Sequence, residues 1–356
     1  MTDIIKKLET ACDASDEELK GLIGSASCDT ALYEAADRVR RANYGTDVYM
    51  RGLIEFTSYC KNDCFYCGLR RSNRSAVRYR LEKSDILECA RAGYALGFRT
   101  FVLQGGEDMH YTDDMICDIV SALKAEFPEC AVTLSIGEKS RESYQKYFDA
   151  GADRYLLRHE SADNAHYSKL HPASLSPENR KRCLYDLKEI GYQVGAGFMT
   201  GSPYQTVNEL ISDLRFMQKL RPDMIGIGPF IPHNATPFRD MPAGTLDLTL
   251  RMLAITRLMF PYALIPATTA LGTISPDGRE RGLRAGANVI MPNLSPAEVR
   301  KYYELYNNKL HSGEEAAEAV LIMGRRIRDC GYTPVVARGD VRRGGGEPPL
   351  APRGVS

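Results

Sequence analysis

The sequence predicts an α/β protein built on a (β/α)8 barrel of the TIM type, with a helical cap before the barrel and a helical extension after it. Short apolar runs alternate with amphipathic helical patterns along most of the 356 residues. The runs are continuous rather than alternating, as expected of parallel strands covered on both faces. Gly97, Gly151, Gly191 and Gly286 each close a helical pattern just before such a run. The segments that connect each strand pattern to the next helix pattern are short, which favours a closed barrel.

Eight apolar runs supply the expected strands. In chain order they cover residues 48–56, 100–104, 131–135, 154–158, 193–198, 224–228, 263–267 and 288–291. The helical patterns between them cover residues 84–96, 113–126, 140–150, 178–190, 206–219, 247–260, 279–285 and 296–304. An open doubly wound sheet is the alternative, and it is disfavoured because no G-x-G-x-x-G follows the first strand.

Two ends fall outside the barrel, which we place at residues 46–305. Residues 1–45 carry three helical patterns and are expected to cap the N-terminal face of the barrel. Residues 306–339 form a C-terminal helical extension with the helix EEAAEAVLIMGRRIRDC. Residues 340–356 are rich in Gly, Pro and Arg and cannot bury a core, so we expect a disordered tail.

Composition excludes several classes of protein. The chain has 46 basic and 46 acidic residues, so no global field favours nucleic acid or an anionic membrane. No apolar run reaches the roughly 18 residues of a membrane span, and MTDIIKKLET does not resemble a signal peptide. Seven of ten cysteines are scattered singly, as expected of reduced thiols. We therefore expect a soluble, cytoplasmic protein with neither nucleic acid nor membrane as a partner.

The remaining three cysteines, Cys60, Cys64 and Cys67, form a C-x3-C-x2-C run directly after the first expected strand. Structural zinc usually takes four protein ligands in two pairs, whereas here three sulfurs come together. A four-iron cluster held by three cysteines leaves one iron free to bind a small molecule such as S-adenosylmethionine (SAM). With Phe65 and Tyr66 before the third cysteine, the run resembles the signature of the radical SAM superfamily.

Polar or small residues follow the second and third expected strands. Gly105, Gly106 and Glu107 follow strand two and could grip an ammonium group, although a tight turn with a solvated acid explains them almost as well. Ser135 ends strand three and offers a hydroxyl.

The fourth strand ends in Arg158, His159 and Glu160, a combination that is hard to explain in an apolar core. His159 alone is as readily structural as functional, and we assign it, together with Arg158, to the pocket of a second ligand beside SAM. Arg180 lies at the start of the next helix, where its guanidinium could donate two hydrogen bonds to a carboxylate. The alternative is that Arg180 is an arginine on the exposed surface of the helix.

The last two strands end in residues that we assign to a second ligand. Strand seven ends in Thr268 and Thr269, and strand eight in Met291. Tyr303 and Tyr306 lie one turn apart on an expected helix after strand eight, where they either face the barrel mouth or pack. The predicted site holds SAM and a second, polar ligand.

Several longer runs make the resemblance more specific. They are IEFTSYCKNDCFYCGLR, VLQGGED, GADRYLLRHE, GIGPFIPH, IPATTALGT and GANVIMPN. Over residues 45–310 they resemble the HydE family of FeFe-hydrogenase maturases, in the radical SAM branch that includes biotin synthase and methylornithine synthase.

The resemblance implies cofactors, residue roles and partners. Cys60, Cys64 and Cys67 would ligate a 4Fe-4S cluster, and Ser135, Glu160 and Arg180 would hold SAM. The enzyme would help to assemble the di-iron subcluster from an organometallic precursor, together with other maturases and an electron donor such as a flavodoxin or ferredoxin. Some relatives carry a second cluster near the C-terminus. Residues 305–330 here contain only Cys330, so we expect none.

Alternatives remain open at this point. A methylornithine synthase or a biotin-synthase-like enzyme would share the cluster and the barrel, and a non-catalytic iron–sulfur carrier would share the cysteines. The sequence also leaves open whether the radical abstracts hydrogen or adds to sulfur.

Overall fold

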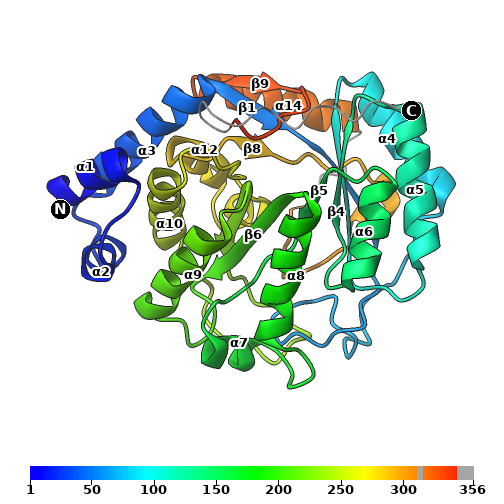
Figure 1. Ribbon diagram of the computed structural model, residues 1–356, viewed down its shortest axis with the longest axis horizontal. Helices are drawn as coiled ribbons and strands as arrows, with labels where there is room; N and C mark the ends of the chain where they lie inside the picture. Colours follow the sequence, from blue (N-terminus) through cyan, green and yellow to red (C-terminus); the bar gives the residue numbers. More distant parts are fainter. Residues whose placement is uncertain (311–315, 343–356) are drawn as a thin grey trace.

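Parallel strands close into a barrel in the computed structural model, which describes residues 1–310 and 316–342 (Figure 1). Six strands form one sheet in the order β2-β3-β4-β5-β6-β7, and three form another in the order β8-β1-β9. The strands are β1 (Asp47–Met50), β2 (Gly52–Thr57), β3 (Thr100–Gly105), β4 (Ala131–Ser135), β5 (Arg154–Leu156), β6 (Gln193–Thr200), β7 (Met224–Pro229), β8 (Val289–Ile290) and β9 (Thr333–Val335). The predicted barrel class is confirmed.

Single bridges join the two sheets and close the ring. Met224 of β7 pairs with Leu264, and Pro266 pairs with Val289 of β8, so residues 263–267 fill the seventh position without forming a regular strand. Pro266 has no N–H to donate to a ladder, which accounts for the irregularity. The first expected strand, 48–56, is divided at Arg51 into β1 and β2, and the two halves belong to different sheets.

Helices cover the outside of the barrel. They are α1 (Thr2–Ala11), α2 (Asp16–Gly24), α3 (Asp29–Tyr44), α4 (Lys83–Ala95), α5 (Asp113–Glu126), α6 (Arg141–Asp149), α7 (Asn164–Leu170), α8 (Pro177–Ile190), α9 (Val207–Leu220), α10 (Leu246–Met259), α11 (Thr269–Ile274), α12 (Gly278–Arg284), α13 (Ala297–Arg300) and α14 (Ala316–Asp329). Their ends follow local chemistry: α8 starts with a Ser176 cap and Pro177 in its first turn, and it ends at left-handed Gly191.

The sequence did not predict α7, α11 or β9. The helix expected at 296–304 is only the short α13, so Tyr303 and Tyr306 lie on irregular chain after it. Within the described ranges, no helix has the length and apolar character needed to cross a bilayer.

The N-terminal helices do not cap the N-terminal end of the barrel, contrary to the expectation for residues 1–45. Helix α3 packs along α10 and α12, α1 packs on α3 and α10, and α2 packs on α9 and α10. Figure 1 shows them beside the outer helices rather than across the strands. Their buried apolar residues, such as Leu8, Leu22 and Leu32, therefore extend the outer helical layer.

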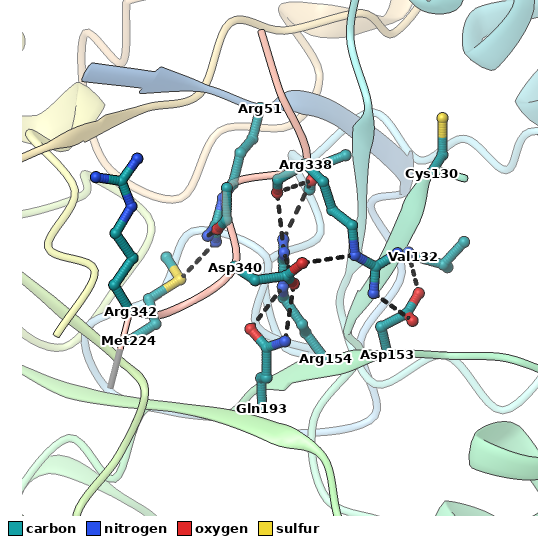
Figure 2. A network of polar contacts seen from close by, with 12 residues as sticks. Arg51, Cys130, Val132, Asp153, Arg154, Gln193, Met224, Arg338, Asp340 and Arg342 are labelled. Carbon is teal, nitrogen blue, oxygen red and sulfur yellow. Dashed lines mark hydrogen bonds and ion pairs between the residues drawn. The ribbon is translucent and has the colours of Figure 1, made fainter. Parts of the chain in front are cut away.

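A C-terminal segment, Arg338 to Asp340, closes the N-terminal end of the barrel (Figure 2). Arg51 donates to the Gly339 carbonyl at 3.0 Å, and Arg154 pairs with the Asp340 carboxylate at 2.6 Å. Arg51 and Arg154 are 1% and 3% exposed, and buried guanidinium groups need partners. The disordered tail expected from residue 340 is therefore wrong for residues 340–342; residues 343–356 lie outside the described chain.

Candidate functional site

A cavity of about 340 Å³ lies at the C-terminal ends of the strands, opposite the Arg338–Asp340 closure. Strand ends meet there because parallel strands of a barrel all point the same way. Of the residues predicted from the sequence, those that line the cavity are Cys64, Cys67, Gly105, Ser135, Arg158, Glu160, Arg180, Thr268, Thr269, Met291, Tyr303 and Tyr306. One cavity thus collects most of the predicted site.

The cysteine loop is held against the barrel by close backbone contacts. A side chain at Gly106 would put its Cβ 2.2 Å from the Tyr59 carbonyl, and one at Gly68 would lie 2.2 Å from the Glu304 carbonyl. The Phe65 N–H donates to the Leu170 carbonyl at 3.0 Å. Glycine at these two positions lets the loop approach β3 on one side and residues 304–305 on the other.

The three thiols are partly buried, and this burial raises the pKa of each. The pKa of Cys67 rises to about 12 through burial and the neighbouring Cys60, and that of Cys64 rises well above its usual value through burial and Cys67. Thiols in such surroundings stay protonated unless positive charge is brought among them. Bound iron would supply that charge.

The donor set fits a cluster better than a single ion. In residues 1–310 and 316–342, no group of three or more His, Cys, Asp or Glu side chains converges as on one metal ion. In a four-iron cluster each thiolate binds a different iron, so the sulfurs need not meet at one point. Cys64 and Cys67 face the cavity, where a ligand of the remaining iron would lie.

Glu160 has the strongest marks of a ligand-binding side chain. Its backbone is left-handed, with φ of 64°, a conformation that costs energy outside glycine and clusters at functional sites. Its Oε2 is buried without a hydrogen-bond partner among the described residues, and so is Nε of Arg158. Arg158 Nε lies 3.7 Å from Glu160 Oε1, too far to satisfy either group. A polar ligand in the cavity would satisfy both.

Arg180 reaches the same cavity from the first turn of α8. Its Nε lies 2.5 Å from Oε1 of Glu138, and its NH1 donates to the Arg158 carbonyl at 3.3 Å. Although burial lowers the pKa of Arg180, the Glu138 carboxylate raises it well above the usual value. Arg180 is therefore a permanent cation, and Glu138, which the sequence did not single out, fixes its position.

Residues at the ends of strand positions seven and eight line the opposite part of the cavity. Within the part of the chain that the structure describes, Thr268 Oγ1 is buried without a hydrogen-bond partner, whereas Thr269 Oγ1 accepts a bond from Arg279 at 3.2 Å. Thr268 caps the unpredicted helix α11. Tyr303 and Tyr306 line the cavity without the expected helix, and burial raises the pKa of Tyr306 to about 12.

Two predicted residues are engaged elsewhere. His159 is fully buried outside the cavity lining, 3.2 Å from Asp213, and its ring meets that of Phe216 edge-on, so it is structural rather than part of the substrate pocket. Glu107 accepts a hydrogen bond from the Glu138 N–H at 3.0 Å and pairs with Lys61 at 3.4 Å. Its side chain does not line the cavity, in contrast to the expectation that it grips a ligand.

Sequence reasoning missed further polar groups in or beside the cavity wall. Lys309 pairs with Glu55 at 2.5 Å, and both side chains are almost fully buried. Arg279 contributes an Nε that has no hydrogen-bond partner in residues 1–310 and 316–342. Tyr66 shares a 3.1 Å hydrogen bond with His171, whose pKa burial lowers to about 3, so this imidazole stays neutral.

The chain was compared with protein families and with individual proteins. Residues 54–217 match the family model described as the radical SAM superfamily. The chain is 46% identical to the FeFe hydrogenase maturase subunit HydE of Thermotoga maritima, over 93% of this chain and 95% of that protein.

More distant similarity extends to another activity. The chain is 29% identical to 3-methylornithine synthase of Methanosarcina acetivorans, over 92% of this chain and 93% of that protein. The crystal structure of a methylornithine synthase superposes with a TM-score of 0.83 at 28% identity, covering 93% of this chain and 97% of that one. The overall fold is therefore shared over most of both chains.

Proposed function

The chain belongs to the radical SAM superfamily and, within it, to the family of the maturase HydE, and we propose that it cleaves SAM in the maturation of an FeFe hydrogenase. The observation that carries this proposal is the 46% identity over 93% of the chain. The cavity supports it, because two of the three loop cysteines and the free polar atoms of Glu160 and Thr268 face one space.

The three loop cysteines would hold a 4Fe-4S cluster, and Glu160, Arg180 and Ser135 would hold SAM beside it. When bound, the cluster supplies the electron that breaks the C5′–S bond of SAM and yields a 5′-deoxyadenosyl radical. Arg180 offers a fixed cation to the methionyl carboxylate, because Glu138 holds the guanidinium in place. Glu160 offers a carboxylate oxygen to the amino group or the ribose hydroxyls.

The remaining cavity wall would position the second ligand and exclude water. Thr268 offers a free hydroxyl and Arg158 a free N–H, which suits a polar or anionic organometallic substrate. Closure of the far end by Arg338 to Asp340 leaves the strand C-termini as the side from which ligands enter. A closed barrel confines a reactive radical to one aligned atom.

Three further assignments complete the proposal. The enzyme works in the cytoplasm with other hydrogenase maturases and takes its electron from a flavodoxin or ferredoxin. It has no second cluster, since Cys330 is the only cysteine in residues 305–330. Its substrate is a small organometallic precursor.

The test is a comparison of products. Anaerobically reconstituted protein, given SAM and a reductant, should release 5′-deoxyadenosine and should activate an apo-hydrogenase in a mixture lacking only this maturase. The same protein given a mixture of amino acids should form no methylornithine. Methylornithine formation without hydrogenase activation would replace the proposal with the synthase activity of the more distant relatives.

A further inference from the structure

The loop that carries the three cysteines is basic, although the chain as a whole is neutral. Residues 61–80 hold six Lys or Arg residues and one acid, Asp63, whereas the chain has 46 basic and 46 acidic residues. The excess is therefore a local property of this loop.

Four of the six cations are already engaged. Arg70 pairs with Asp63, Arg80 with Asp108 and Lys61 with Glu107, and Arg78 donates to backbone carbonyls that include that of Leu69. These four residues hold the loop in place. Because their side chains are already engaged, these four residues contribute little positive charge to attract a partner protein.

Arg71 and Arg74 are different, because both are exposed and neither has an ion pair among the described residues. Their position relative to the cysteines is fixed: the Arg71 N–H donates to the Asn62 carbonyl at 2.8 Å, and the Arg70 N–H donates to the Cys67 carbonyl at 3.1 Å. Two free cations thus lie on the outer side of the loop whose inner side faces the cavity.

A shallow surface hollow continues this cationic area. Arg70, Arg74 and Arg239 contribute to its lining, and none of its lining residues belongs to the active-site cavity. The acids nearby are Asp63, paired with Arg70, and Asp240, a highly exposed carboxylate that pairs with Arg239. Val77, 55% exposed, adds an apolar side chain on the same loop. We call Arg71, Arg74, Val77 and Arg239 the loop patch.

We propose that the loop patch is the docking surface for a small acidic one-electron carrier protein that reduces the cluster. The inference rests on the proposed function, since it presumes a cluster on the three cysteines. In the step itself the carrier loses one electron and the cluster gains it, and no atom is transferred. Complementary charge speeds such encounters, and redox encounters use small interfaces. The loop patch offers positive charge and a small set of residues for such an encounter. It includes the chain segment next to the cluster ligands.

Charge reversal tests the patch directly. The double variant Arg71→Glu/Arg74→Glu of the reconstituted holoenzyme is mixed with a reduced acidic ferredoxin, and bleaching of the cluster absorbance gives the second-order rate. At low ionic strength the rate should fall about 10- to 100-fold, and the difference from the natural protein should shrink as salt screens the charges. Titration with oxidised ferredoxin should show the same loss in affinity.

Two controls separate this inference from the proposed function. The variant Lys6→Glu/Lys20→Glu makes the same change in net charge on α1 and α2, on the other side of the molecule from the loop (Figure 1), and should keep the natural rate. Dithionite, a small reductant that needs no docking, should drive 5′-deoxyadenosine release equally in all three proteins.

The outcomes are distinct. Equal loss of ferredoxin reduction in both double variants would assign the effect to net charge and overturn the patch, as would an unchanged rate in Arg71→Glu/Arg74→Glu. If that variant kept its ferredoxin rate but lost hydrogenase activation in a mixture of maturases, the surface would belong to a sister maturase. Failure of dithionite to drive SAM cleavage in the natural protein would instead refute the proposed function.

Discussion

At the scale of single residues, the polar atoms of the cavity wall are of two kinds. Some already have hydrogen-bond partners within the protein, and others are left for a ligand. Among the described residues, the buried atoms of the wall without a partner include Glu160 Oε2, Arg158 Nε, Arg279 Nε and Thr268 Oγ1. Thr269 lies next in sequence, but its hydroxyl already accepts a bond from Arg279. Because an unsatisfied buried polar group is costly, the free atoms mark the positions where bound molecules contribute most.

Arg180 should be required for SAM affinity. Replacing it in Arg180→Met removes the cation for the methionyl carboxylate and should weaken SAM binding by roughly 1.5–3 kcal/mol, the range for a hydrogen bond to a charged group. Calorimetric titration of the reconstituted protein measures the change. Arg182→Met is the matched control, because Arg182 is exposed on the same helix and pairs with Asp186.

A conservative variant separates binding from structure. Arg180→Lys keeps a cation beside Glu138 and should recover part of the lost affinity, whereas a purely structural defect would not depend on charge. Unchanged SAM affinity in Arg180→Met would remove Arg180 from the SAM site.

Thr268 should serve the second ligand rather than SAM. Thr268→Val keeps the shape and removes the free hydroxyl, so hydrogenase activation should fall about 5- to 10-fold, as for one lost hydrogen bond, while 5′-deoxyadenosine release continues. Thr273→Val is the control, since that hydroxyl bonds the Thr269 carbonyl within α11. Parallel loss of both activities in Thr268→Val would place Thr268 in SAM binding or in folding.

Sequence reasoning found the residues whose chemistry is local and missed those whose partners are distant. The cysteine run, Arg158 and Glu160 could be read directly from the sequence. Glu138 could not, because its partner Arg180 lies on another element, and Lys309 meets Glu55 from 254 residues away. His159 was misassigned for a related reason: its partner, Asp213, lies on α9 and is not adjacent in the sequence.

At the scale of elements, regular units were predictable and irregular ones were not. Apolar runs and glycine stops gave β3, β4, α5 and α8 nearly to the residue. The seventh position failed as a strand because Pro266 interrupts the ladder, and α11 is too short to show a periodic pattern. The C-terminal closure was missed because a segment rich in Arg and Gly resembles disorder until buried partners are known.

The closure makes a stability prediction. Asp340→Asn removes the carboxylate that pairs with buried Arg154 and should lower the free energy of unfolding by about 1–3 kcal/mol, less than for a fully buried pair because Asp340 is partly exposed to solvent. Urea unfolding measures the loss. Asp329→Asn, at an exposed position without an ion pair among the described residues, should change little.

The same pair predicts a pH dependence. Although burial raises the pKa of Asp340, the Arg154 ion pair prevails and lowers it to about 2. A lowered pKa contributes stability that is complete above the unfolded value of about 4 and disappears as the pH falls towards 2. The difference between the natural protein and Asp340→Asn should close over this window, and a gap that persists at pH 2 would contradict the ion-pair account.

At the scale of the whole molecule, the barrel has one closed end and one functional end. Arg51 and Arg154 anchor the closure at the strand N-termini, and the cysteine loop borders the cavity at the strand C-termini (Figures 1 and 2). The N-terminal helices broaden the outer layer, and Tyr44 at the end of α3 reaches the closed end, where its hydroxyl accepts a hydrogen bond from the Arg342 N–H at 3.2 Å. This arrangement places the cysteine loop, where we propose that the electron carrier docks, at the surface, and it places the radical chemistry inside the barrel.

The most direct test of the central claim is cluster content and SAM cleavage in cysteine variants. Cys60→Ala, Cys64→Ala and Cys67→Ala, reconstituted anaerobically, should each lose the electron paramagnetic resonance signal of a reduced 4Fe-4S cluster and release no 5′-deoxyadenosine. Cys183→Ala, which alters a buried thiol on α8, should keep both. A full cluster with SAM cleavage in any of the three loop variants would contradict the account.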